Sequence, residues 1–255
     1  MSKLVLALTL SAIGMTAAEA NLTQQEADDI VKKFAAKESA FAKARENYTY
    51  RQTVRVQELD ASNNLGGKHE MVSDIIFTSD GKRTERVVRA PVSTLRTIQI
   101  SPEDEADLRN VQPFVLTSNE VDSYHVRYLG KESIDEIGCY LFAVKPKRME
   151  TGKRYFSGII YVDDRDLQIV KSYGRATGIL KKKEDQQFPK FETYREQIDG
   201  KYWFPTYTVA NDTLMFQSGP QPIRMTVKYE DYKQFKSDVI IKFEDQEAKP
   251  QPKKP

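Results

Sequence analysis

The chain has 255 residues, of which 39% are hydrophobic and 30% charged, and 39 Lys and Arg against 37 Asp and Glu give a net charge of +2. This balance argues against nucleic acid as the main partner, because nucleic-acid-binding domains carry a marked excess of positive charge. The single cysteine, Cys139, excludes an intramolecular disulfide, so burial of apolar side chains must hold the fold together.

The first residues of the chain have the pattern of a secretory signal peptide. A short basic start ends at Lys3, an apolar stretch covers residues 4–16, and Ala18-Glu19-Ala20 is a small-x-small cleavage site. The apolar stretch is shorter than the ~20 residues that a membrane-spanning helix needs. We therefore predict cleavage after Ala20 and export of the mature chain. The predicted division is a signal peptide over residues 1–20, one domain over 21–245 and a Pro-containing disordered tail over 246–255.

One long amphipathic helix is predicted from Thr23 to Arg45. Thr23 and Glu26 have the spacing of a capping box, which defines the start of the helix. The apolar residues recur at spacings of three, four and seven, so they share one face that must lie on an apolar surface. These residues are Ala27, Ile30, Val31, Phe34, Ala35 and Phe41.

The rest of the chain predicts antiparallel strands interrupted by one short helix. Bulky and polar residues alternate, which is the pattern of half-buried strands. The short helix is predicted over 102–110, with Ser101 as its N-cap and Pro102 in its first turn. Strands are predicted over residues 48–58, 70–78, 83–89, 123–129, 138–145, 154–162, 167–174, 191–198, 202–209, 223–232 and 239–243.

These elements predict an α+β fold. About ten or eleven strands joined by short turns form one large curved antiparallel sheet. A sheet of this size must close or be covered, and the long helix together with the segment 102–116 can cover it. We expect an unclosed β-barrel with an N-terminal helix and a short helical lid.

No motif in the sequence predicts catalysis, a cofactor or a metal site. His69 and His125 lack the neighbouring ligands of a metal site or triad, and His125 is expected to be an exposed strand residue. Neighbouring carboxylates occur at 28–29, 163–166 and 230–231, where helix-surface, turn and strand-edge roles are favoured over acid–base chemistry. The chain is therefore predicted not to be an enzyme.

Two hairpins carry a resemblance to a known family. Gly158-Ile-Ile-Tyr-Val-Asp-Asp164 is followed by Leu167-Gln-Ile-Val170, and a later strand carries Gly200-Lys-Tyr-Trp203-Phe-Pro205. With the signal peptide, the N-terminal helix and the helical interruption, this layout resembles the bacterial outer-membrane lipoprotein-sorting family, the LolA-like carriers.

The resemblance implies a periplasmic carrier without a cofactor that shelters the acyl chains of lipoproteins or lipids on the concave face of the sheet. It also implies donor and acceptor proteins at the membranes, and we expect a monomer. The implied lid-locking arginine is not identified among Arg51, Arg55, Arg83 and Arg86. The predicted lining residues are Phe34, Phe41, Tyr50, Val54, Val56, Tyr124, Val126, Tyr128, Tyr140, Phe142, Val144, Tyr155, Ile159 and Tyr161.

A second interpretation stays open at this point. The same aromatic rows are equally the pattern of an ordinary hydrophobic core. In that case the chain is a structural or stress-sensing envelope protein whose core is filled by its own side chains. The sequence does not distinguish an open cavity from a filled one.

Overall fold

The computed structural model describes residues 22–78, 81–179, 189–216 and 218–235. The predicted signal peptide, the strand predicted over 239–243 and the predicted tail lie outside these residues. No helix among the described residues combines the length and hydropathy required to cross a membrane.

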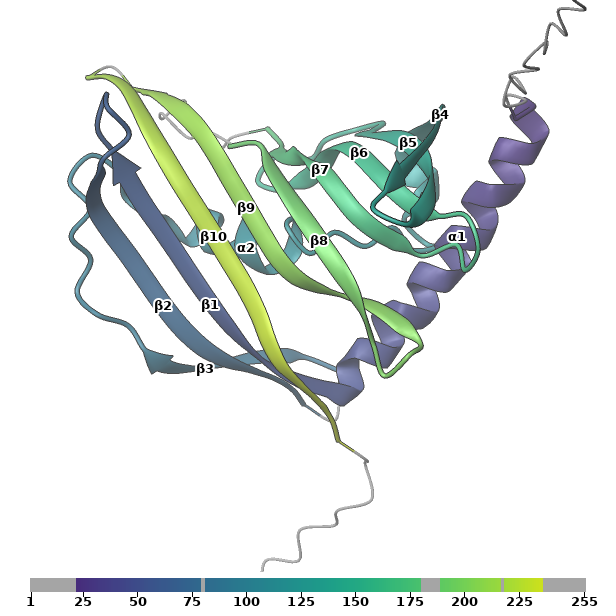
Figure 1. The fold of residues 1–255 in the computed structure, drawn as a ribbon, viewed down its shortest axis with the longest axis horizontal. Helices are drawn as coiled ribbons and strands as arrows, with labels where there is room; N and C mark the ends of the chain where they lie inside the picture. The colour runs from purple at the N-terminus through teal and green to yellow at the C-terminus, as the bar shows by residue number, and fades with distance from the viewer. Residues whose placement is uncertain (1–21, 79–80, 180–188, 217, 236–255) are drawn as a thin grey trace, which may run out of the picture.

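The described residues form one antiparallel sheet of ten strands in the order β3-β2-β1-β10-β9-β8-β7-β6-β5-β4 (Figure 1). Strands that are neighbours in sequence pair with each other, except β3 and β4, and β10 returns to pair with β1. The two edge strands, β3 and β4, lie at opposite ends of this order, so the sheet is not closed and the predicted fold class is confirmed. The strands are β1 Tyr48–Leu59, β2 Leu65–Phe77, β3 Arg83–Arg89, β4 Tyr124–Ile134, β5 Ile137–Pro146, β6 Tyr155–Asp163, β7 Ile169–Thr177, β8 Phe191–Ile198, β9 Tyr202–Phe216 and β10 Gly219–Gln234.

The hairpin of β9 and β10 is longer than predicted. Gly219 pairs with Phe216, and the ladder continues past Pro220 and Pro222 towards the middle of the sheet. Strand β1 pairs with β10 only as far as Ile223, so the two prolines lie where β10 has a partner on one side. Proline is tolerated at such a position because no neighbouring strand on the open side needs a backbone N–H group from it.

The long helix, α1 (Gln24–Ala44), begins at the predicted capping box. The backbone N–H of Glu26 donates to Thr23 Oγ1 at 3.3 Å, and the N–H of Thr23 donates to Glu26 Oε2 at 2.8 Å. Ala27, Phe34 and Phe41 of the predicted apolar face are buried, and so is Glu38 on the same face. A buried carboxylate there was not predicted.

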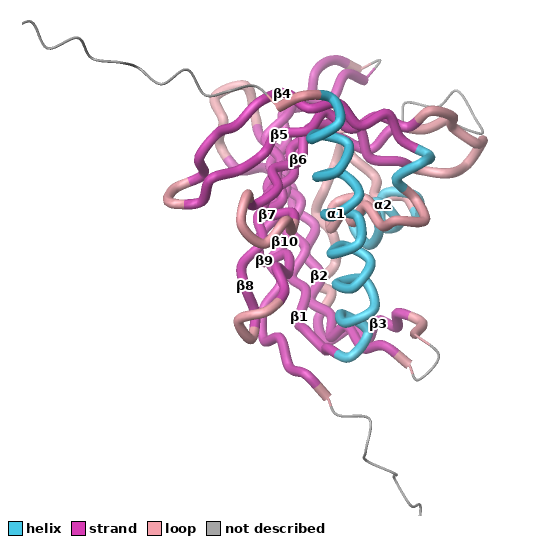
Figure 2. Tube along the Cα trace, turned by 90° about the vertical axis from the view of Figure 1, so that its right-hand side faces the viewer, coloured by secondary structure: helices cyan, strands magenta, loops and turns pink. Residues whose placement is uncertain are grey.

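Both helices lie on the same side of the sheet (Figure 2). The short helix α2 (Pro102–Asn110) starts at the predicted N-cap, where the Asp104 N–H donates to Ser101 Oγ. The residues that follow α2 continue over the sheet and enter the main hydrophobic core with Phe34 of α1. We call α2 and the residues that follow it, up to Leu116, the cover. The core contains Leu108, Val111, Phe114 and Leu116 from the cover, and Val54, Phe142, Phe156 and Ile160 from the sheet.

Candidate functional site

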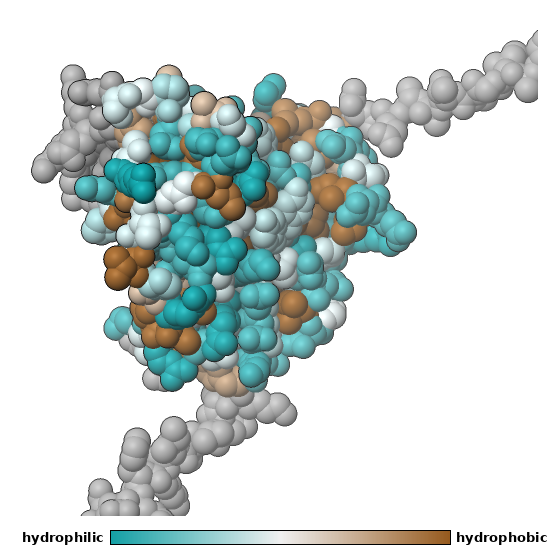
Figure 3. All heavy atoms as spheres, turned by 60° about the vertical axis from the view of Figure 1, so that its left-hand side comes forward, coloured by the Kyte–Doolittle hydropathy of each residue, from teal (hydrophilic) through white to brown (hydrophobic). Residues whose placement is uncertain are grey.

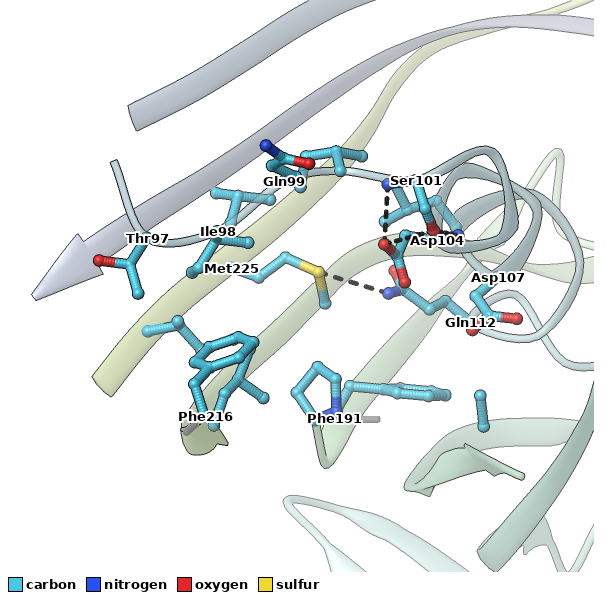
Figure 4. Close-up of a pocket in the computed structure, with 17 residues that line it drawn as sticks. Thr97, Ile98, Gln99, Ser101, Asp104, Asp107, Gln112, Phe191, Phe216 and Met225 are labelled. Atoms are coloured by element: carbon cyan, nitrogen blue, oxygen red, sulfur yellow. Dashed lines mark hydrogen bonds between the residues drawn. The ribbon is translucent and has the colours of Figure 1, made fainter. Parts of the chain in front are cut away.

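A cavity of about 400 Å³ lies between the concave face of the sheet and the segment formed by residues 97–112 (Figure 4). Its volume is within the range of small-molecule sites in proteins. Most of its walls are apolar side chains from five strands and from the segment itself. The lining residues are Val56, Ala176, Pro189, Phe191, Leu214, Phe216, Ile223 and Met225, with Thr97, Ile98, Gln99, Ile100, Ser101, Asp104, Asp107, Leu108 and Gln112 from the segment.

The rim of the cavity is held by the buried carboxylate of Glu58 at the end of β1. The backbone N–H groups of Arg96, Thr97 and Ile98 donate to its oxygens at 3.0, 2.6 and 2.9 Å. Three consecutive N–H groups directed at one carboxylate form an anion-binding concavity, which fixes the course of the chain. Glu58 therefore positions the side of the cavity that contains Thr97 and Ile98.

A close approach of two backbones also requires Gly67 at this rim. A Cβ atom at Gly67 would lie 2.3 Å from the carbonyl oxygen of Thr94. The Thr94 N–H donates to the Lys68 carbonyl at 2.8 Å, so the rim segment pairs with β2 beside this glycine. Any larger residue at position 67 would displace the segment.

The opposite side of the cavity is formed by α2, which contains Asp107, and by Gln112, which follows the helix. The backbone carbonyl of Gln112 accepts a hydrogen bond from Thr193 Oγ1 at 2.8 Å, and Thr193 in turn lies 2.8 Å from Thr208 Oγ1. All four side chains are buried. This polar contact fixes the end of the α2 segment to β8 and β9.

Asp107 is the most strongly perturbed carboxyl group in the cavity wall. Its pKa is raised to about 7, mainly by burial; the guanidinium of Arg154 opposes this rise and the Asp104 carboxylate adds to it. Arg154 Nε lies 4.0 Å from Asp107 Oδ1, which is an ion-pair distance but too long for a hydrogen bond. Near neutral pH the carboxyl group is therefore divided between its protonated and ionised forms.

A buried ion pair fixes α1 and the cover to the sheet. Arg195 of β8 donates through one guanidinium nitrogen to both carboxylate oxygens of Glu38 of α1, and through another to the backbone carbonyl of Phe114. None of the arginines considered from the sequence makes this contact. The available signal was a charged residue, Glu38, on the apolar face of a helix, and a charged residue, Arg195, in phase with the buried Phe191 and Thr193.

Of the predicted lining residues, Val56 alone lines the cavity. Phe34, Val54, Phe142 and Val144 are buried in the main core. Phe41 belongs to a second cluster with Tyr48 and Phe204. Five other predicted residues, on β1, β4 and β5, are half-buried and pack against the main core: Tyr50, Tyr124, Val126, Tyr128 and Tyr140.

The predicted inward face of β6 is displaced by one residue. Phe156, Ile160 and Val162 are buried in the main core, so the alternation of the strand places Tyr155, Ile159 and Tyr161 on the opposite face. The register agrees, because the buried Phe142 pairs with Ile160 and its neighbour Ala143 pairs with Ile159. Both rows of β6 are apolar or aromatic in sequence, so alternation alone did not identify the inward row.

The described residues contain no group of three or more His, Cys, Asp or Glu side chains arranged to hold a metal ion. The acidic turn after β6 has a structural role: Asp163 Oδ1 accepts from the Arg165 N–H at 2.7 Å, and Asp166 Oδ2 accepts from the Trp203 indole at 2.7 Å. The two hairpins that carry the family resemblance are thus joined at their turns. His125 is exposed, as predicted.

The surface differs from the cavity in its hydropathy. Figure 3 shows one side of the molecule, where hydrophilic residues cover most of the surface and hydrophobic residues form separate patches. Exposed hydrophobic residues are spread over several elements, including Leu65 of β2, Val87 of β3 and Met215 of β9. Scattered exposed residues of this kind are usual for proteins in water.

Comparison with known proteins gives matches only among solved structures. No family model matches the chain, and no curated protein matches it. A DUF1329 family protein from Desulfovibrio piger is 16% identical with a TM-score of 0.42, and the match covers 81% of this chain and 95% of that one. A putative outer membrane lipoprotein-sorting protein domain from Vibrio parahaemolyticus is 13% identical with a TM-score of 0.38, covering 80% and 93%. A LolA superfamily protein from Nitrosomonas europaea is 14% identical with a TM-score of 0.35, covering 79% and 94%.

Two of these matches carry the family name that the hairpins of this chain suggested. At such identities and TM-scores the matches transfer no function. The function must be inferred from the cavity and the contacts of this chain.

Proposed function

We propose that this chain is a periplasmic, non-enzymatic carrier that binds an acyl chain of a lipoprotein or lipid in the cavity beneath α2 and moves it toward the outer membrane. The observation that carries the proposal is the cavity of about 400 Å³ with mainly apolar walls, between the sheet and a separate helical cover. The signal-peptide pattern over residues 1–20 supports export.

The energetic reason for such a carrier is the cost of exposing an acyl chain to water. At ~0.8 kcal/mol per methylene group, about fourteen methylene groups cost on the order of 11 kcal/mol. The walls formed by Ile98, Leu214 and Ile223 offer an apolar environment that replaces water around part of such a chain. Binding in the cavity would therefore keep the chain in solution between two membranes.

The cover is attached by polar contacts that can be separated without breaking the sheet. Glu58 holds the rim through backbone N–H groups, and Arg195 holds the Phe114 carbonyl and Glu38. These contacts join the cover and α1 to the strands and are not part of the strand ladder. Together with the apolar contacts of the cover in the main core, they keep the cavity a defined space beside the strand ladder.

The test is to fill the cavity with a side chain. Ala176→Leu adds volume where Ala176 lines the cavity, and Ala143→Leu makes the same change on the outer face of β5. We expect wild type and Ala143→Leu to bind an acylated peptide with one-to-one stoichiometry in native mass spectrometry, and Ala176→Leu to bind at least about tenfold more weakly. Equal binding by both folded variants would place the ligand elsewhere and reject this cavity as the site.

One observation favours a second function. The concave face beside α1 is filled by side chains of the protein. The ring centroids of Phe114 and Phe156, which are stacked, lie 4.4 Å apart, and those of Phe34 and Phe142 lie 5.5 Å apart. A self-filled fold of this kind suits a structural or stress-sensing envelope protein. Purification from an envelope extract without copurifying lipid, together with no binding of added acylated peptide, would favour this second function.

A further inference from the structure

Two buried hydrogen-bond acceptors in the cavity wall have no hydrogen-bond donor. They are Oδ1 of Asp107 and Oε1 of Gln112, in residues that are 8% and 5% exposed. Both residues line the cavity, and Figure 4 shows them together at one end of it, with Ile98 and Phe216 at the other. Buried acceptors are nearly always paired, so a pair of unpaired ones in one cavity indicates a missing donor.

The orientation of the Gln112 amide follows from its neighbour. Gln112 Nε2 donates to the thioether sulfur of Met225 at 3.4 Å. A thioether can accept a hydrogen bond but cannot donate one, so the amide nitrogen belongs on that side. The carbonyl oxygen is then the unpaired atom of the side chain.

The remaining polar groups near this end of the cavity do not supply the donor. Arg154 Nε is 4.0 Å from Asp107 Oδ1, beyond hydrogen-bond distance, and Arg154 is not among the described residues that line the cavity. Asp104 is engaged with the N–H and hydroxyl of Ser101 at 2.9 and 2.7 Å. The end of the cavity is thus rich in acceptors, and the charge of the Asp107 carboxylate is balanced by the nearby Arg154 guanidinium.

We propose that the ligand of this cavity carries a neutral hydrogen-bond donor, a hydroxyl or an amide N–H, beside its apolar chain, and that Asp107 and Gln112 recognise this donor. The inference rests on the proposed function, because it specifies the head group of the bound acyl compound. An ionised carboxylate head group offers no donor to these two acceptors, and the Asp104 carboxylate beside them repels it. The site therefore selects monoacylglycerols and fatty amides against free fatty acids.

The experiment compares three ligands of equal chain length: a monoacylglycerol, a primary fatty amide and a fatty acid. Binding to the full mature chain is measured by calorimetry at a pH at which the fatty acid is ionised. We expect the two neutral ligands to bind wild type about tenfold or more tightly than the fatty acid, which corresponds to ~1.4 kcal/mol or more. This comparison needs no variant, so it does not depend on the folding of one.

Two substitutions locate the selectivity. Gln112→Leu replaces the amide, and with it the acceptor Oε1, by an apolar side chain of similar size. We expect it to reduce the preference for the neutral ligands by about fivefold. Gln57→Leu makes the same chemical change on the face of β1 opposite the cavity-lining Val56, and it should leave the preference unchanged. Thermal unfolding of both variants verifies that they are folded.

The outcomes separate the two proposals. If none of the three ligands binds, the carrier function fails and the head-group inference with it. If all three bind with equal affinity, or the fatty acid binds best, the carrier function stands and the selectivity is overturned. If the preference is present but Gln112→Leu keeps it in full, the assigned acceptor is wrong.

Discussion

Glu38 and Arg195, separated by 157 positions in sequence, form a fully buried ion pair between α1 and β8. Arg195 Nη1 lies 3.1 and 3.2 Å from the two carboxylate oxygens of Glu38. Glu38 Oε1 also accepts from the Ile169 N–H at 3.2 Å, and the guanidinium lies over the Phe41 ring at 5.1 Å. One contact thus joins α1, the cover at Phe114, and the strands β7 and β8.

Removal of one partner of this pair should be far more damaging than removal of both. Arg195→Met leaves a buried carboxylate without its counter-charge, and we expect a loss of about 3–5 kcal/mol in the free energy of unfolding. The double variant Glu38→Leu with Arg195→Met buries no charge and should recover most of that loss. Urea unfolding of the two variants measures the difference.

The control for this prediction is the exposed pair of Glu150 and Lys153. Glu150→Gln should change the unfolding free energy little, because water screens exposed ion pairs. If the Arg195→Met variant were as stable as Glu150→Gln, the buried pair would have no role in attaching the cover.

The stability of the protein should depend on the ionisation of Asp107. Its pKa is near 3.8 in the unfolded chain and about 7 in the folded protein, so the folded state holds the proton more tightly. Below about pH 4 both states are protonated; as the pH rises to about 7 the unfolded state loses the proton first, and the folded state loses stability. Above about pH 7 the loss is complete.

Asp107→Asn should remove this dependence. The difference in unfolding free energy between the variant and wild type is expected to shift in favour of the variant by on the order of 1–4 kcal/mol between pH 4 and pH 8. Denaturant unfolding of both proteins at several pH values measures the shift. The attraction to Arg154 acts only on the ionised carboxylate and is already included in the folded-state pKa, whereas effects of the substitution that do not depend on pH cancel in this comparison. A difference that stays the same from pH 4 to pH 8 would show that Asp107 titrates normally.

The sequence predicted the elements of the fold well because they depend on local signals. The capping box at Thr23, the N-cap at Ser101 and the alternation of the strands all lie within short windows and are all present. The inward row of β6 was predicted incorrectly because both of its rows are apolar, so the choice between Ile159 and Ile160 depends on pairing with β5.

The site was less predictable because its residues have no shared local pattern. Glu58 and Arg195 are charged residues whose burial depends on partners far along the chain, the backbone N–H groups of 96–98 and the carboxylate of Glu38. Gln112 follows the end of a short helix, where no periodicity indicates which side chains face inward. The aromatic rows predicted as cavity lining lie in or against the hydrophobic core in several strands, and the cavity lies beside that core.

The Glu58 carboxylate should control the order of the cavity rim. Glu58→Gln replaces an anion that accepts from three N–H groups by a neutral amide with a single acceptor oxygen. We expect the amide protons of Arg96, Thr97 and Ile98 to exchange with solvent about tenfold faster or more. Asp60→Asn is the control, because Asp60 also accepts from backbone N–H groups but lies in the exposed turn after β1. Unchanged exchange at 96–98 in Glu58→Gln would show that the rim is held by other contacts.

Gly158 of the family-like hairpin should be irreplaceable for a packing reason. It pairs with Gly174, and a Cβ atom at Gly158 would lie 2.2 Å from the Tyr173 carbonyl oxygen and 2.9 Å from the Phe156 ring. The backbone of β7 and the buried Phe156 ring would both have to shift to make room for a methyl group, which costs free energy. Gly158→Ala should therefore lower the unfolding free energy by about 1–3 kcal/mol. Ser157→Ala, at the adjacent position on the opposite face, is the matched control and should have little effect. Thermal and urea unfolding of the pair measure this difference, and equal stability of the two variants would mean that β6 and β7 can separate enough to accept a methyl group.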